Sequence, residues 1–130
     1  ILDYSEPDIR NNIIYNEGGA SNSFGVHESA ANADPLYLQN NIFYGFQYYY
    51  YDDDLLQSIN YISDVNNLSG DYSNNADEMP DFNNPAAYDY SLTANFTSID
   101  GLDLGTNYNI DRNGSERTPL WSIGAYELDN

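Results

Sequence analysis

Carboxylates and tyrosines are the side chains of this sequence whose number and spacing could do chemistry. The densest acidic group is Asp52, Asp53 and Asp54. Two looser groups follow it along the chain: Asp77, Glu78 and Asp81, and then Asp100, Asp103 and Asp111. Ca²⁺ takes several oxygen ligands from carboxylates and loop carbonyls, so each group is a candidate calcium site. None has the spacing of an EF-hand or a nonapeptide repeat, and a solvated acidic loop is the alternative for each.

Four consecutive tyrosines, Tyr48, Tyr49, Tyr50 and Tyr51, precede the densest acidic group. Successive side chains of a strand point to opposite faces, so we expect two rings to point inward and two outward. Outward rings beside carboxylates could stack on sugar rings while the carboxylates accept hydrogen bonds from hydroxyls. The alternative is that the tyrosines pack against neighbouring strands. The four tyrosines are therefore our candidates for glycan stacking.

The net charge excludes several classes of partner. The chain has 21 acidic and 3 basic residues, which gives a formal net charge of −18. Nucleic acids and anionic membranes require a basic patch, so we expect neither as a partner. Without cysteine the chain can form neither a disulfide nor a thiolate metal site. No apolar run is long enough for membrane insertion. This acidic, tyrosine-rich composition favours an extracellular or cell-surface protein.

Three asparagines begin Asn-x-Ser/Thr sequences and are candidate glycosylation sites: Asn67, Asn95 and Asn113. Such sequences also arise by chance in a chain that is rich in asparagine. Glycosylation would require a source cell that performs it.

A degenerate repeat is the main indication of fold. Residues 9–15 read Ile-Arg-Asn-Asn-Ile-Ile-Tyr, and residues 38–44 read Leu-Gln-Asn-Asn-Ile-Phe-Tyr, an offset of 29 residues. A weaker third copy begins at Val65. The pattern has neither heptad nor helical periodicity, and it suits a stack of short strands.

An asparagine that recurs once per coil can bond to its copies along the stack, because its amide has two donors and an acceptor oxygen. We expect this ladder to consist of Asn12, Asn41 and Asn67. Beside it in the turn we expect Asn11, Asn40 and Asn66. An interior apolar column would then consist of Ile13, Ile42 and Leu68.

The rest of the chain is interpreted as loops and short strands. Residues 17–34 are small, polar and glycine-rich, which indicates an excursion between coils. Residues 88–92, 98–100 and 121–127 are expected to be strands. Near the end, Gly114 suits a turn with positive φ, and Gly124 permits close approach to a neighbouring strand. Arg117 is expected to pair with Glu127 or Asp111.

These segments resemble the right-handed parallel β-helices of the pectin-lyase-like superfamily, in particular the C-terminal region of secreted members. Asp89-Tyr90-Ser91-Leu92-Thr93 with residues 97–101, Thr-Ser-Ile-Asp-Gly, is similar to a recurring segment of that family. Residues 111–117 and 123–127 are similar to its ending, with Asn113 and Ser122 in place of two aspartates. The resemblance implies an all-β, right-handed parallel β-helix, or β-solenoid, of three to four coils with long loops.

The resemblance says little about activity. Lyases of this fold are implied to use lysine or arginine beside calcium, and this chain has no lysine. Its glycosidases are implied to carry motifs that are absent here, and His27 has no partnered motif. Whether this chain is an enzyme stays open, and its sequence favours a non-catalytic role. No residue is assigned a catalytic or cofactor-binding role.

We therefore expect residues 1–130 to form a single β-helix domain, with ladder coils in 1–70 and a C-terminal coil with a closing strand in 71–130. The expected role is non-catalytic, structural or adhesive. The N-terminal coil lacks a polar cap, so self-association there could build filaments end to end. The alternative is the C-terminal part of a polysaccharide-active or glycan-binding β-helix protein. Calcium is the expected ion, and glycans are possible partners under either reading.

Overall fold

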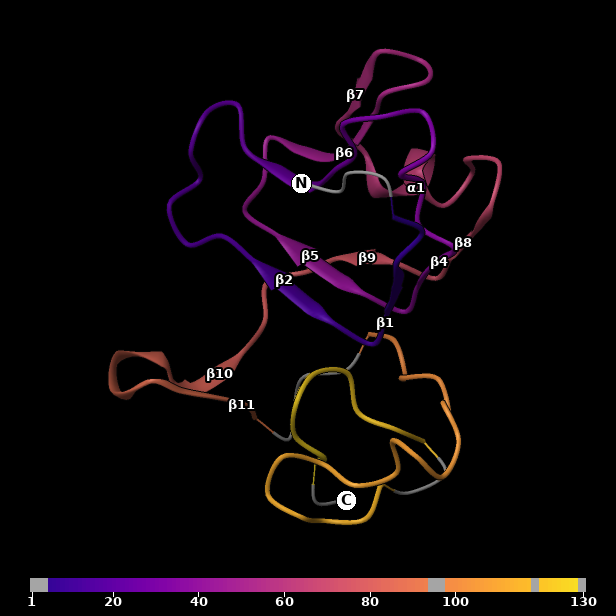
Figure 1. Cartoon of the computed structure of the whole chain (residues 1–130). Coiled ribbons are helices and arrows are strands. Elements are labelled where there is room, and N and C mark those ends of the chain that lie inside the picture. The colour runs from indigo at the N-terminus through magenta and orange to yellow at the C-terminus, as the bar shows by residue number, and fades with distance from the viewer. Residues whose placement is uncertain (1–4, 94–97, 118–119, 129–130) are drawn as a thin grey trace.

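A computed structural model describes residues 5–93, 98–117 and 120–128 of this all-β protein. Three sheets form its body (Figure 1). The first sheet contains, in spatial order, β1 (Asp8–Arg10), β4 (Tyr37–Gln39) and β8 (Asp71–Ser73). The second contains β2 (Ile13–Tyr15), β5 (Ile42–Tyr44) and β9 (Ala76–Asp77). The third contains β3 (Phe24–His27), β6 (Tyr48–Asp52) and β7 (Gln57–Ile59).

All strand pairs of the first two sheets are parallel, and so is the β3–β6 pair; only β7 joins antiparallel. The chain passes through the three sheets in the same order twice, and then a third time through the first two. Ile13 lies opposite Ile42, and Tyr15 opposite Tyr44, so the 29-residue offset of the sequence repeat is the offset between passes. The structure thus has two complete passes and a partial third.

The corner between the first and second sheets explains the Asn-Asn pairs. The first asparagine of each pair has a left-handed backbone, with φ of 57° at Asn11, 51° at Asn40 and 54° at Asn74. Asparagine tolerates this conformation better than most residues. The third copy is therefore Asn74-Asn75, and the expected copy at Val65 is wrong. That segment ends a one-turn helix α1 (Ile62–Val65), which with β7 lengthens the loop before the third pass.

The main core lies between the three sheets. It contains Leu38, Phe43, Val26, Tyr50 and their buried neighbours, with Ile9 and Ile14 packed at its margin. The expected column of Ile13, Ile42 and Leu68 is wrong, because Leu68 packs against this core whereas Ile13 and Ile42 do not face it. Strand alternation points them outward, where they meet Leu92 and Ile123 in a second cluster.

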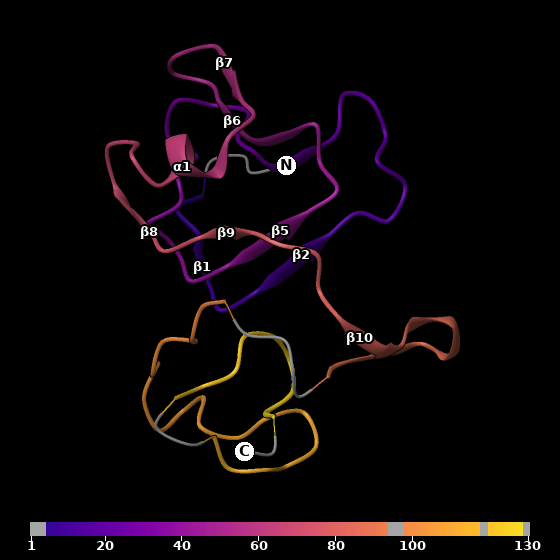
Figure 2. The same ribbon diagram turned by 180° about the vertical axis from the view of Figure 1, so that it is seen from behind.

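The C-terminal part of the chain lies beside the sheets and does not extend them (Figures 1 and 2). After β9 comes an antiparallel hairpin of β10 (Phe82–Asn84) and β11 (Asp89–Leu92), joined through a 3₁₀ turn η1 (Pro85–Ala87). Residues 98–117 and 120–128 form turns with two isolated bridges, Gly101–Trp121 and Ile110–Glu116.

Three expected elements differ from the structure. Residues 98–100 and 121–127 are not strands, because their backbone groups bond to corner asparagines and buried side chains instead of to a strand. The expected closing coil is accordingly a lateral segment. Residues 17–34 are not only loop, because they contain β3, whose partner β6 supplies aromatic contacts. No helix in the described ranges could cross a membrane.

Candidate functional site

The asparagine ladder has one repeating geometry. The backbone N–H and the Nδ2 of Asn12 both donate to Oδ1 of Asn41, at 2.9 and 3.1 Å. Asn41 donates in the same way to Oδ1 of Asn75, at 3.1 and 3.0 Å. Asn75 then donates to Oδ1 of Asn66, at 3.1 and 2.8 Å. Every oxygen in the ladder therefore points toward the first pass, and every donor points away from it.

The second Nδ2 hydrogen of each ladder residue bonds the corner to a strand of the first sheet. Asn12 donates to the carbonyl of Arg10, Asn41 to that of Ile9 and Asn75 to that of Leu38, each at 2.8 Å. Asn41 is fully buried and all of its polar atoms have partners. A buried amide that is fully bonded stabilises one corner geometry, whereas an unbonded one would be costly.

The ladder is closed at Asn66. Its Nδ2 donates to the carbonyl of Asn75 at 2.9 Å, and its backbone N–H donates to Ile62 within α1 at 3.0 Å. Asn66 thus accepts from Asn75 as the ladder asparagine of a further pass would, but its own Nδ2 donates to a backbone carbonyl and not to another asparagine. The expected third member, Asn67, is exposed, and its Nδ2 donates to the carbonyl of Ser63 at 2.8 Å.

The opposite end of the ladder, at Asn12, is open. Within the described residues, Oδ1 of Asn12 accepts no hydrogen bond, and the residue is exposed. Strands β1, β2 and β3 are each the outer strand of their sheet. All three belong to the first pass, so the open amide and the three open strand edges lie at the same end of the body. We call this surface the open end.

The acidic candidates do not gather around a common centre. Oδ1 of Asp52 accepts from the N–H of Leu55 at 2.8 Å, and Oδ1 of Asp103 accepts from Gly105 at 2.7 Å. Asp54 and Asp100 are exposed. In the described part of the chain, no three His, Cys, Asp or Glu side chains could hold one metal ion. Calcium binding stays a prediction that rests on net charge.

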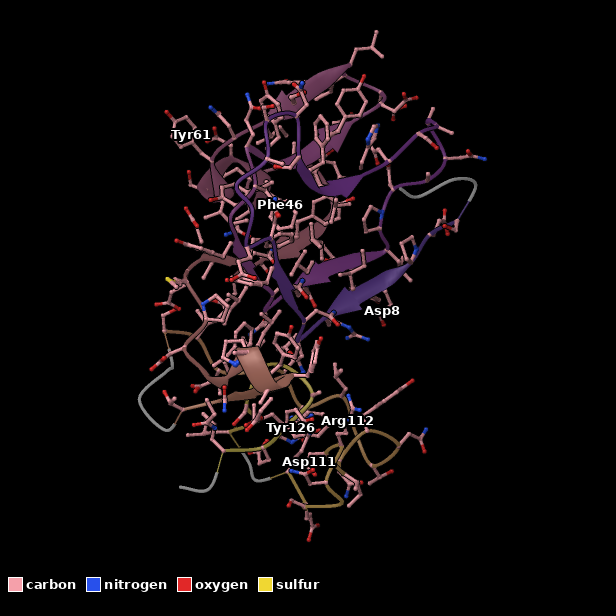
Figure 3. All side chains as sticks on the ribbon, turned by 90° about the vertical axis from the view of Figure 1, so that its left-hand side faces the viewer. Asp8, Phe46, Tyr61, Asp111, Arg112 and Tyr126 are labelled. Atoms are coloured by element: carbon pink, nitrogen blue, oxygen red, sulfur yellow. The ribbon has the colours of Figure 1, made fainter. Side chains whose placement is uncertain are left out.

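Asp111 and Arg117 organise the C-terminal segment. Burial acts to raise the pKa of Asp111, but N–H donors of Glu127, Ser115 and Asn113 outweigh it and hold that pKa below its usual value. Arg117 donates to Glu127 at 3.3 Å and to the carbonyls of Ser122 and Gly124, which confirms Glu127 as its partner. In Figure 3 Asp111 and Tyr126 lie in this segment, far from Phe46 and Tyr61 in the body.

Gly114 and Gly124, the two glycines singled out in the sequence, both have positive φ, as expected for Gly114 at +88° and observed also for Gly124 at +96°. A Cβ on Gly124 would lie 2.9 Å from Cδ1 of Ile13. The N–H of Gly124 donates to the carbonyl of Asn11 at 2.9 Å, so its neighbour is the first corner.

The four tyrosines divide into two inward and two outward rings, although not in alternation. Tyr49 and Tyr50 are both buried in the main core. Tyr48 and Tyr51 are half-buried and pack against Phe24 across the third sheet, with ring centroids 5.2 and 5.8 Å apart. These contacts favour cross-strand packing over an open stacking surface for Tyr48 and Tyr51.

The candidate glycosylation sites have different surroundings. Asn67 and Asn113 are exposed, while Asn95 lies outside the described residues. His27 packs against the rings of Phe24 and Tyr51 at centroid distances of 4.9 and 4.7 Å, so it belongs to β3 and not to the loop expected for residues 17–34.

Sequence reasoning missed Glu28, which follows β3 and is 1% exposed. It accepts from the hydroxyl of Tyr50 and from the N–H of Asp53, each at 2.8 Å. Burial, together with the neighbouring Asp34 carboxyl, raises the pKa of Glu28 to about 7. Nothing in its polar surroundings in the sequence indicated a buried carboxyl.

The chain's own residues carry the functional argument. Comparisons with protein-family models, with curated proteins and with solved structures found no match.

Proposed function

We propose that this protein is a non-catalytic parallel β-helix module that joins its open end to a further coil of the same kind. The repeated order of the three sheets supports a β-helix, and parallel crossovers of this type are almost always right-handed. The resemblance to the pectin-lyase-like superfamily and an extracellular or cell-surface location belong to the same proposal, on the residues and composition already described.

The open Oδ1 of Asn12 carries the proposal. Each later ladder oxygen accepts one backbone and one side-chain N–H from the asparagine of the preceding pass. The preferred occupant is therefore a parallel coil whose corner asparagine supplies these two donors, while its strands pair with β1, β2 and β3. Such a coil would satisfy the amide and three strand edges together.

A continuous end-to-end filament has less support than attachment at one end. The donors of Asn66 are already used within the chain, so a second copy has no free ladder donors at that end. This asymmetry favours a structural module that ends a stack of coils.

A catalytic role has less support from the geometry. The carboxyl of Glu28 has a raised pKa, to which the Asp34 carboxyl contributes, but it accepts its hydrogen bonds inside the body, from Tyr50 and Asp53. Glu28 is also almost completely buried, which keeps a saccharide from reaching it.

The experiment duplicates residues 8–36 directly before Asp8, because one 29-residue pass leads from Asp8 to its partner Tyr37. The copied Asn12 should then donate to the original Asn12, and the copied strands should pair with β1, β2 and β3. We expect a higher free energy of unfolding and slow hydrogen exchange in the copied unit. The matched control carries Asn12→Ala only in the copy and should gain less. A copied unit that exchanges as fast as an unfolded chain would overturn the proposal.

A further inference from the structure

A cavity of about 550 Å³ lies outside the second sheet, between β2, the β10–β11 hairpin and the C-terminal segment. Its walls include Asn12, Ile13 and Tyr15 from the first pass, Phe82 and Tyr90 from the hairpin, and Gly124. Gly124 and the adjacent Ala125 have little or no side chain, which keeps this side of the cavity wide. We call it the hairpin groove.

Among the described residues that line the hairpin groove, none is charged. This is notable in a chain with 21 acidic and 3 basic residues, whose net charge repels anions. When a neutral ligand binds to an uncharged lining, no charged group has to lose its hydration. A polyanion would still be repelled by the net charge of the protein. The electrostatics therefore favour a neutral ligand.

Three aromatic rings shape the groove. Phe82 meets Tyr15 edge to face at 5.4 Å and meets Tyr90 edge to face at 5.3 Å, with interplanar angles of 86° and 88°. This chain of perpendicular contacts fixes the ring orientations. Tyr90 is 47% exposed, so part of its ring is open to solvent. Sugar rings present apolar C–H faces that pack on aromatic rings of this kind.

The groove also contains polar atoms that can bond to a ligand. Among the described residues, the hydroxyls of Tyr15 and Tyr90 form no hydrogen bond. A phenol hydroxyl both donates and accepts, which matches the hydroxyls of a sugar. Asn11 is not available in this way, because its amide exchanges two hydrogen bonds with the backbone of Leu102 at 2.8 Å each.

We propose that the hairpin groove binds an uncharged oligosaccharide. The rings of Tyr15, Phe82 and Tyr90 pack against its sugar faces, and the two tyrosine hydroxyls bond to its hydroxyls. This site differs from the tyrosines of β6, which the sequence suggested for the same chemistry. It goes beyond coil attachment at the open end, and neither proposal requires the other.

The test is titration calorimetry and saturation-transfer NMR with neutral hexose oligosaccharides, using oligogalacturonate as the anionic comparison. We expect binding of at least one neutral ligand and none of the anionic one. Tyr90→Ala should weaken that binding about tenfold, which is the loss of one aromatic contact. Tyr90→Phe keeps the ring and should weaken it by a smaller factor. Tyr61→Ala is the matched control, because Tyr61 is 64% exposed and lies on the body away from the groove.

Three results would overturn this proposal: no saturation transfer to any neutral ligand at millimolar concentration, equal weakening by Tyr90→Ala and Tyr61→Ala, or equal binding of oligogalacturonate. Hydrogen exchange of the coil-duplicated protein reports on the open end separately, so failure of one proposal is distinguishable from failure of the other.

Discussion

At one end of the ladder, Asn66 uses its acceptor and donors within the chain, while at the other end the oxygen of Asn12 has no partner in the described residues. Both ends are made from the same side chain. The difference comes from the neighbouring elements: α1 and its turn place Asn66 over the third pass, whereas no described strand lies outside β1, β2 and β3. An asparagine at a corner thus ends a stack or leaves it open according to what lies next to it.

The largest expected effect is at the middle of the ladder, where both neighbours depend on one amide. Asn41→Ala would leave the N–H of Asn12 and the carbonyl of Ile9 without these partners, and it would remove one of the two donors to Oδ1 of Asn75. We expect a loss of about 3 kcal/mol in the free energy of unfolding, measured by urea denaturation. Asn12→Ala, at the open end, should cost less than about 1 kcal/mol. Equal losses would show that position in the ladder does not matter.

The second prediction concerns the proton of Glu28, the residue that directly follows β3. The folded protein raises the pKa of Glu28 from its usual 4.5 to about 7, so the folded state binds this proton more tightly than the unfolded state. The resulting stability is complete below about pH 4.5 and is lost as the pH rises through 7.

The groups that face Glu28 are the carboxyl of Asp34, the hydroxyl of Tyr50 and the N–H of Asp53. Glu28→Gln keeps the shape without the ionisation. Between pH 5 and pH 8, the wild type should lose about 2 kcal/mol more stability to urea than this variant. The other carboxylates contribute equally to both proteins. Parallel pH profiles would show that Glu28 binds its proton no more tightly in the folded state.

The third prediction tests how the C-terminal segment meets the first corner, beside the open end. Gly124→Ala places a left-handed alanine whose Cβ lies 2.9 Å from Cδ1 of Ile13, and should cost about 2 kcal/mol. Gly114→Ala has a similar φ but open space around it, and should cost about 1 kcal/mol. Adding Ile13→Val to Gly124→Ala removes the clashing methyl group and should restore part of the loss in thermal denaturation. No restoration would mean that the contact contributes nothing.

The fourth prediction concerns the closed end, where the expected effect is small. Asn66→Ala removes the acceptor for two donors of Asn75 but leaves water access to the half-buried site, so it should cost about 1 kcal/mol. Hydrogen exchange of the Asn75 amide should accelerate, while that of the Asn12 amide should not. If both amides accelerate alike, the two ends are not independent and the comparison fails.

The Asn-Asn repeat predicted the first two passes, because the Asn-Asn pair and the strand that follows it have nearly the same sequence in both. The third pass was missed because Ala76 replaces the isoleucine and because β7 and α1 are inserted before it. Strand β3 was missed because its aromatic partners lie 24 residues later, at Tyr48 and beyond. The C-terminal segment was interpreted as a coil, since its bonds to Asn11 and Asn40 depend on tertiary contacts that no local pattern encodes.

The uniform direction of the ladder has an electrostatic consequence for assembly. Because every amide oxygen points toward the first pass, the side-chain dipoles add along the column, with their negative pole at Asn12. Two copies brought face to face through their open ends would oppose like poles and present acceptor to acceptor. Growth through the ladder is therefore vectorial, and the ladder disfavours a two-fold symmetric dimer at that surface.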